Sequence, residues 1–264
     1  MSGLTGRLAR IAQLVGHAHT LADIGSDHGL LPIALLQTGR IARAIAIEIS
    51  EGPHQAVSRA IADAGVNDRM EARLGDGCAP LSREEADVVV IAGMGGHTIW
   101  TILTAPATRQ TFASRPPRLI LQPMNGTGLI RFWAQQAGYR VREDVRVKEG
   151  ALLYECLALD PPVLDRDKMW VGPTEADHAQ YEALSAELRM RYLCGEAGLH
   201  MRCQLLAWQV QVEIAKRQRV MHCLAYPLAD RAKERLMQIR QEYGALLRLQ
   251  DELAVLQGEQ SATP

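Results

Sequence analysis

Acidic residues and glycines gather in four short turns, each at the end of an apolar run that is typical of a β-strand. The first turn reads Asp23-Ile24-Gly25-Ser26-Asp27-His28, and the others contain Glu48, Asp76-Gly77 and Ala92-Gly93-Met94. Neither the dinucleotide fingerprint G-x-G-x-x-G nor the phosphate loop G-x-x-x-x-G-K-[ST] occurs in the chain. The turns therefore favour a ligand that presents amines and hydroxyls over one that presents phosphates.

S-adenosylmethionine fits this description, because it carries an ammonium group, a sulfonium and a ribose but no phosphate. Glu48 ends the second apolar run, where a carboxylate can accept hydrogen bonds from both ribose hydroxyls. Asp76 follows the third run and can hold the exocyclic amine of adenine, and glycines after the fourth run let the backbone approach a ligand closely. Each turn alone is common, and an acid at a strand end is often merely solvated. Their succession at four consecutive strand ends predicts one binding site.

These turns need a scaffold that brings strand ends to one edge, and the first 160 residues have the pattern of such a scaffold. Apolar runs alternate with segments of helical period, which predicts a parallel sheet covered by helices. The expected strands span residues 19–25, 42–49, 70–74, 87–92, 118–122, 139–147 and 152–159, and the expected helices span 30–37, 54–64, 97–103 and 128–137. Lys148-Glu149-Gly150-Ala151 resembles a hairpin connection, so an antiparallel pair should close the sheet. The fold class is α/β with a mainly parallel, seven-stranded sheet, whose ligands bind at the carboxyl ends of the strands.

The pattern changes at Asp160-Pro161-Pro162, where a stretch rich in Pro and Asp begins. We therefore expect a ligand-binding domain over residues 1–160, and a linker with a smaller all-helical domain over residues 161–264. From Thr174, which fits an N-cap, apolar residues recur at spacings of three and four. This spacing predicts two or three long, coiled-coil-like helices with an antiparallel hairpin turning near Tyr226-Pro227. The helices should pack either on one another or on a second copy of the chain in a homodimer.

The composition is that of an ordinary globular protein. Of 264 residues, 47% are hydrophobic and 22% are charged, and the formal net charge of −1 gives no overall attraction to nucleic acid. Five cysteines without a C-x-x-C pair fit neither a disulfide framework nor a zinc module, and His200 with Cys203 or His222 with Cys223 fits helix packing better than a metal site. No apolar run reaches the roughly 20 residues of a membrane span, and no signal peptide is recognisable. We expect a cytoplasmic protein with no metal and no membrane partner.

Several stretches resemble one known family. DIGSDHGLLPIAL, AIEISEGPHQAV, GDGCAPL, VVIAGMGG, LILQPMN and YECLAL together resemble the TrmK family of bacterial tRNA adenine N1-methyltransferases, which act on adenine 22. The resemblance covers the first domain in order, and the family's helical appendage corresponds to the second in position and length. It implies a Rossmann-like class I methyltransferase domain, S-adenosyl-L-methionine as the cofactor and tRNA as the substrate.

The resemblance also assigns residues. It implies that Asp23, Gly25 and His28 surround the methionine end of the cofactor and that Glu48 binds its ribose. It further implies that Asp76 and Gly77 bind the adenine, and that Ala92, Gly93 and Met94 form the floor beside the methyl group. The family's Gln-Pro-Asn motif reads Gln122-Pro123-Met124-Asn125 in this chain. Either Met124 replaces the family's Asn, or Asn125 takes its place facing the base.

Methyl transfer from a sulfonium is an in-line displacement, to which a protein contributes mainly orientation and a dry pocket. Adenine N1 already has an in-plane lone pair, but the product ring is cationic, so a nearby carboxylate would stabilise the developing charge. Asp27, two residues past Gly25, is our first catalytic candidate, and Asn125 is the second. Asp27 fits equally well as an N-cap for the helix expected to begin near Gly29.

A folded tRNA hides N1 of a stacked base, so the target must leave its stack while the protein grips the tRNA body. Basic residues of the second domain that could contact phosphates are Arg202, Lys216, Arg217, Arg219, Arg231, Lys233, Arg235 and Arg240. Any single one of them fits a solvated helix face equally well. Two other functions stay open, namely methylation of another RNA, a protein or a small molecule, and a non-catalytic cofactor-binding module whose coiled coil recruits partners.

Overall fold

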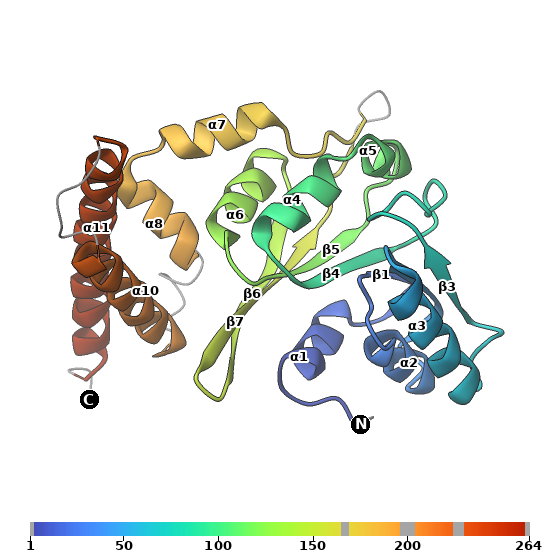
Figure 1. Cartoon of the computed structure of the whole chain (residues 1–264). Coiled ribbons are helices and arrows are strands. Elements are labelled where there is room, and N and C mark those ends of the chain that lie inside the picture. The colour runs from blue at the N-terminus through green and yellow to red at the C-terminus, as the bar shows by residue number, and fades with distance from the viewer. Residues whose placement is uncertain (1–2, 165–168, 196–203, 224–229, 262–264) are drawn as a thin grey trace. The chain divides into compact units, whose positions relative to one another are not determined.

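Seven strands form one sheet in the computed structural model, which describes residues 3–164, 169–195, 204–223 and 230–261 (Figure 1). In chain order the strands are β1 (Ala18–Ile24), β2 (Ile41–Glu48), β3 (Met70–Leu74), β4 (Val88–Met94), β5 (Arg118–Pro123), β6 (Arg140–Glu149) and β7 (Leu152–Asp160). Their order in the sheet is β3-β2-β1-β4-β5-β7-β6, with β1 to β5 parallel and β7 antiparallel to both of its neighbours. The seven strands and the closing antiparallel pair predicted from the sequence are confirmed.

Helices cover this sheet, and the central strands are apolar because they are buried on both faces. The helices are α1 (Gly6–Val15), α2 (Leu30–Gln37), α3 (Glu51–Asp63), α4 (Gly96–Thr104), α5 (Pro106–Phe112) and α6 (Thr127–Gln136). Residues of α1, α2 and α3 share one core cluster with buried residues of β1 and β2. The sequence analysis did not assign α1 or α5. Helix α5 has only seven residues and begins at a proline, so its short sequence contains no sustained helical period.

The segment after β7 stays with the sheet, in contrast to the linker expected there. One compact unit comprises residues 1–126 and 133–174. Within it, Trp170 is buried, its amide donates to Ala113 O at 2.7 Å, and its ring meets that of Phe112 edge-on at 5.3 Å. This sheet unit therefore extends past residue 160, because a buried tryptophan fastens the Pro-rich segment to it.

The second compact unit, the helical unit, comprises residues 127–132 and 175–264. Its helices are α7 (Glu175–Ala183), α8 (Ala186–Cys194), α10 (Gln204–Cys223) and α11 (Asp230–Ser261). Apolar residues of α8, α10 and α11 form one buried cluster that includes Met190, Leu206, Ile214 and Leu249, so these helices pack on one another. The predicted turn near Tyr226-Pro227 lies outside the described residues. Within the described ranges, no helix combines the length and apolar character needed to cross a membrane.

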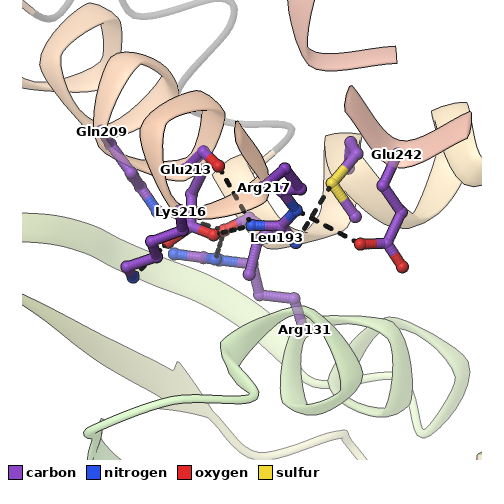
Figure 2. A network of polar contacts seen from close by, with 8 residues as sticks. Arg131, Leu193, Gln209, Glu213, Lys216, Arg217 and Glu242 are labelled. Atoms are coloured by element: carbon purple, nitrogen blue, oxygen red, sulfur yellow. Dashed lines mark hydrogen bonds and ion pairs between the residues drawn. The ribbon is translucent and has the colours of Figure 1, made fainter. Parts of the chain in front are cut away.

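A buried ion-pair network joins α10 to α11 (Figure 2). The Arg217 guanidinium pairs with Glu213 and, at 3.2 Å, with Glu242, and the three side chains are only 10–15% exposed. Removing one partner of such a network leaves a buried charge uncompensated. Arg217 thus connects the two helices. The prediction that it contacts phosphates is wrong, because its guanidinium is buried between two glutamates. Lys216 beside it is 60% exposed.

Candidate active site

The turns singled out in the sequence lie side by side at the carboxyl edge of the sheet. Backbone hydrogen bonds continue past the strand ends, from Gly25 N to Ile47 O and from Gly75 N to Glu48 O, both at 2.8 Å. Ile24 of β1 is also in register with Ile91 of β4. The ends of β1, β2, β3 and β4 therefore form one continuous edge, which is the place where sheets of this kind bind ligands.

Asp23 is a buried carboxyl group at this edge. Its side chain is 5% exposed, and Oδ2 accepts a hydrogen bond of 2.6 Å from the Ser26 hydroxyl. The pKa of Asp23 is raised to about 6, mainly by burial; the Ser26 hydrogen bond lowers the pKa, and the nearby Glu48 carboxylate contributes to the rise. A cationic group beside Asp23 would stabilise the ionised carboxylate, so the site suits a ligand with an ammonium group.

Glu48 is the second buried carboxyl group, 7% exposed at the end of β2. Its Oε1 accepts a hydrogen bond of 2.5 Å from the backbone amide of Asp27. Burial raises the pKa of Glu48, while the hydrogen bond from the Asp27 amide lowers it. The two turns are thus linked, and the orientation of the Glu48 carboxylate is fixed by the backbone of the first turn.

Asp27 itself points its carboxylate toward solvent. The side chain is 83% exposed, its Oδ1 lies 3.7 Å from His28 Nε2, and the backbone adopts a φ of 56°. Helix α2 begins at Leu30 with Gly29 at the N-cap position, and no side chain of the described residues caps it. The capping alternative for Asp27 is therefore wrong, because the left-handed Gly29 separates Asp27 from the helix.

Glycines in the turns after β1 and β3 allow neighbouring side chains to approach the backbone closely. A Cβ added to Gly77 would lie 3.0 Å from Ile102 Cγ2 of α4, and one added to Gly25 would collide with the tip of Met94. Gly25, predicted at the methionine end of the cofactor, and Met94, predicted beside the methyl group, are thus in contact with each other. Asp76 is exposed at the same edge, next to the buried Gly77. Gly77 has a packing role as well as its predicted place near the adenine.

Asn125 and Met124 follow β5 on the other side of the β4 turn. Asn125 Oδ1 accepts a hydrogen bond of 2.9 Å from Gly96 N at the start of α4, and Met124 N donates to Met94 O at 2.8 Å. The Met124 side chain is 52% exposed. Asn125 therefore holds this loop against the start of α4, and Met124 presents an exposed side chain from it.

Three exposed apolar residues at this edge were not singled out in the sequence. Leu30, Ile49 and Leu74 are 55%, 69% and 46% exposed, and they lie at the start of α2 and at the ends of β2 and β3. A run that ends in an acid and then continues with isoleucine, as at Glu48, was the available signal. Such residues would be covered by a flat ligand such as an adenine ring.

The described residues contain no group of three or more His, Cys, Asp or Glu side chains that could hold a metal ion. Cys78 and Cys156 are buried, and burial raises the pKa of each thiol to about 12. His200 and Cys203 lie outside the described residues. Neither buried cysteine is therefore poised as a thiolate ligand or nucleophile.

Comparison with known proteins identifies the family of this chain. Residues 4–157 match the family described as a methyltransferase domain. The tRNA (adenine(22)-N(1))-methyltransferase of Bacillus subtilis (strain 168) is 36% identical over 169 residues, which are 64% of this chain and 69% of the relative. This chain belongs to the tRNA (adenine-22-N1)-methyltransferase family, TrmK.

Solved TrmK structures share the whole architecture. The crystal structure of the B. subtilis m1A22 tRNA methyltransferase TrmK is 27% identical, with a TM-score of 0.77 over 95% of this chain and 100% of its own. A Streptococcus pneumoniae protein named as a candidate tRNA (m1A22) methyltransferase was solved in complex with S-adenosyl-L-methionine. It is 25% identical, with a TM-score of 0.68 over 92% of this chain and 98% of its own. The methyltransferase sheet and the helical appendage are thus common TrmK features.

Proposed function

We propose that this protein transfers a methyl group from S-adenosyl-L-methionine to N1 of adenine 22 in tRNA. The observation that carries the proposal is the pair of buried carboxyl groups, Asp23 and Glu48, at the carboxyl edge of a methyltransferase sheet. When bound, the cofactor supplies the methyl group on a sulfonium, and N1 of the base attacks it in line. The named activity of the B. subtilis relatives supports adenine 22 as the target.

The residues at the edge fit the cofactor. We propose that Asp23 receives the ammonium group, because a buried carboxyl group with a raised pKa needs a cation in order to ionise. Glu48 accepts hydrogen bonds from the ribose hydroxyls, and Asp76 accepts one from the exocyclic amine of the adenine. Ile49 and Leu74 cover the ring, which removes two exposed apolar side chains from water.

The target base is held on the other side of the edge. Asp27 extends an exposed carboxylate where charge develops on the adenine ring, and Met94 forms the floor beside the methyl group. Asn125 positions the base-facing loop through Gly96, and Met124 faces the base. A transfer assay with labelled cofactor and tRNA distinguishes the wider alternatives, which are another substrate or a non-catalytic module.

Glu48→Ala should weaken cofactor binding by about 1.5–3 kcal/mol, because charged hydrogen bonds to the ribose are lost. Calorimetric titration of the folded variant measures the effect. Asp63→Ala is a matched control, because Asp63 is an exposed acid at the end of α3. This variant should bind the cofactor with wild-type affinity. Unchanged affinity in Glu48→Ala would remove Glu48 from the ribose site. Ile49→Ser in the same titration tests the proposed contact between Ile49 and the adenine ring.

Cofactor affinity should rise about tenfold between pH 5 and pH 7, because Asp23 with a pKa of about 6 is largely protonated at the lower pH. The stability of the unliganded protein should change in the opposite direction. The pKa of folded Asp23 lies above its unfolded value, so its contribution to the stability of the unliganded protein is full below pH 3.8 and is lost as the pH rises through about 6.

Titrations of wild type and Asp23→Asn across this pH range measure that dependence. The variant should bind more weakly at pH 7 and with an affinity that no longer depends on pH. An equally steep dependence of the affinity on pH in Asp23→Asn would assign that dependence to a group other than Asp23.

We further propose that the exposed basic residues of the helical unit contact tRNA phosphates. Those of them that were predicted from the sequence to contact phosphates are Lys216, Arg219, Lys233, Arg235 and Arg240. A tRNA substrate is consistent with action in the cytoplasm. The exposed Met237 and Val255 of α11 could pair two copies of the chain, and sedimentation velocity distinguishes that homodimer from a monomer in which α8, α10 and α11 pack on one another alone.

A further inference from the structure

Arg7, in the first turn of α1, places its guanidinium against the end of β4. Its Nη1 donates a hydrogen bond to Gln122 Oε1, and its Cζ lies 5.0 Å from the centre of the Tyr154 ring. A Cβ added to Gly93 would lie only 3.3 Å from the same Nη1. A side chain at position 93 would therefore crowd the guanidinium.

Gln122 connects Arg7 to both sides of the transfer site. It is fully buried at the end of β5, and its Oε1 also accepts a hydrogen bond of 3.0 Å from Gly93 N. Its Nε2 donates to Pro123 O at 3.1 Å and lies 3.6 Å from Met124 Sδ. One side-chain amide thus contacts the turn that carries Met94 and the loop that carries Met124.

The charge of Arg7 fixes which way this amide points. Rotating the Gln122 amide by half a turn would set its NH2 group against two donors, Arg7 Nη1 and Gly93 N. The Gly93 amide and the Pro123 carbonyl each oppose that rotation, and Arg7 adds a charged donor to them. Arg7 therefore strengthens the preference for the orientation in which Oε1 faces Gly93.

The backbone of Arg7 is fixed independently. Its amide donates to the Glu149 carboxylate at the end of β6, and any side chain on Gly6 would collide with that carboxylate. Arg7 Nε is buried with no hydrogen-bond partner among the described residues. The contacts of the guanidinium with Gln122 and with the Tyr154 ring therefore do not involve a hydrogen bond from Nε.

We propose that Arg7 is a positioning residue for methyl transfer, acting through Gln122 to hold the Gly93–Met94 turn and the Met124–Asn125 loop in register. The inference rests on the proposed function, in which the target adenine enters between these two segments. A small displacement of groups that align an in-line displacement lowers the rate without changing cofactor affinity. Arg7 is thus predicted to affect kcat and to leave the binding of S-adenosyl-L-methionine unchanged.

The test compares Arg7→Met with Arg10→Met in the full-length chain. Arg10 lies one turn further along α1 and pairs with Glu143 at 2.6 Å, away from Gln122. Arg7→Met should lower kcat on a tRNA transcript by about ten- to a hundredfold, with KM for tRNA and Kd for the cofactor changed less than about threefold. Arg10→Met should retain the wild-type kcat, and Arg7→Lys, which keeps one charged donor, should recover part of the loss.

A double-mutant cycle with Gln122→Leu tests whether Arg7 acts through Gln122. In the Gln122→Leu background, adding Arg7→Met should lower kcat by less than about a further twofold. Additive losses would overturn the proposal by placing Arg7 in direct contact with a substrate, and an unchanged kcat in Arg7→Met would overturn it outright.

Hydrogen exchange supplies a readout that needs no catalysis. The Gly93 amide should exchange faster in Arg7→Met and at the wild-type rate in Arg10→Met, and equal rates in all three proteins contradict the proposal. A wild-type protein that methylates no tRNA would instead contradict the proposed function, so the two failures are distinguishable.

Discussion

A chain cut after Thr174 should bind S-adenosyl-L-methionine nearly as well as the whole protein and methylate a tRNA transcript at least about a hundredfold more slowly. The cofactor residues all lie in the sheet unit, whereas the exposed basic residues proposed to grip the tRNA lie in the helical unit. Without that grip, the cost of drawing adenine 22 out of its stack is not offset by phosphate contacts. Single-turnover methylation and a cofactor titration on the same preparation measure both quantities.

The cut is placed after Thr174 because Trp170 belongs to the core of the sheet unit. Truncation also exposes Phe132, which meets the rings of Tyr181 and Tyr192 at 5.8 and 5.4 Å. The melting temperature and the cofactor affinity of the truncated chain are therefore measured beside its rate, to show that it is folded. In the full chain, Lys216→Glu with Arg235→Glu provides the matched test, since both side chains are exposed and neither belongs to the buried cluster. Full activity of the truncated enzyme on tRNA would make the helical unit a structural or oligomerisation element.

Asp27→Asn should lower the rate of methyl transfer by about one to three orders of magnitude, because it removes the charge that stabilises the cationic adenine. Asparagine tolerates the positive φ of this position as well as aspartate does, so the hydrogen bond from the backbone amide of residue 27 to Glu48 should persist. With the side chain 83% exposed and absent from the cap of α2, melting temperature and cofactor affinity should change little.

Single-turnover methylation beside a melting curve measures this separation. Asp68→Asn is the control, because Asp68 is an exposed acid whose side chain is 75% accessible and lies outside the site. A normal rate in Asp27→Asn would remove the carboxylate from the mechanism. A slow rate accompanied by an equal loss of stability would contradict a purely electrostatic role.

Much of the sheet unit could be predicted because a parallel sheet buried on both faces requires uninterrupted apolar runs, as in residues 88–91. The turn at Gly150 likewise identified the closing hairpin before the structure did. Helix α5 and the fastening of Trp170 escaped prediction for the same reason. A short polar helix and a single tryptophan in a Pro-rich stretch gain their places only from tertiary packing, which leaves no local period.

The candidate site shows the same division. The strand-end acids Asp23 and Glu48 could be found because topology brings consecutive strand ends to one edge. The contact between Arg7 and Gln122 could not, since it joins residues 115 positions apart and a basic residue in a helix is common. Arg217 was placed with the exposed cations because sequence spacing does not reveal that two glutamates bury it between α10 and α11.

The central claim is methyl transfer to N1 of adenine 22, and one measurement tests it most directly. A tRNA transcript and its matched variant with guanine at position 22 are each incubated with labelled S-adenosyl-L-methionine and the full-length protein, and the modified nucleoside is mapped. The account predicts one methyl group per transcript, at N1 of adenine 22, and none on the guanine variant. Methylation at another nucleotide, or cofactor binding with no transfer to the tRNA, would contradict it.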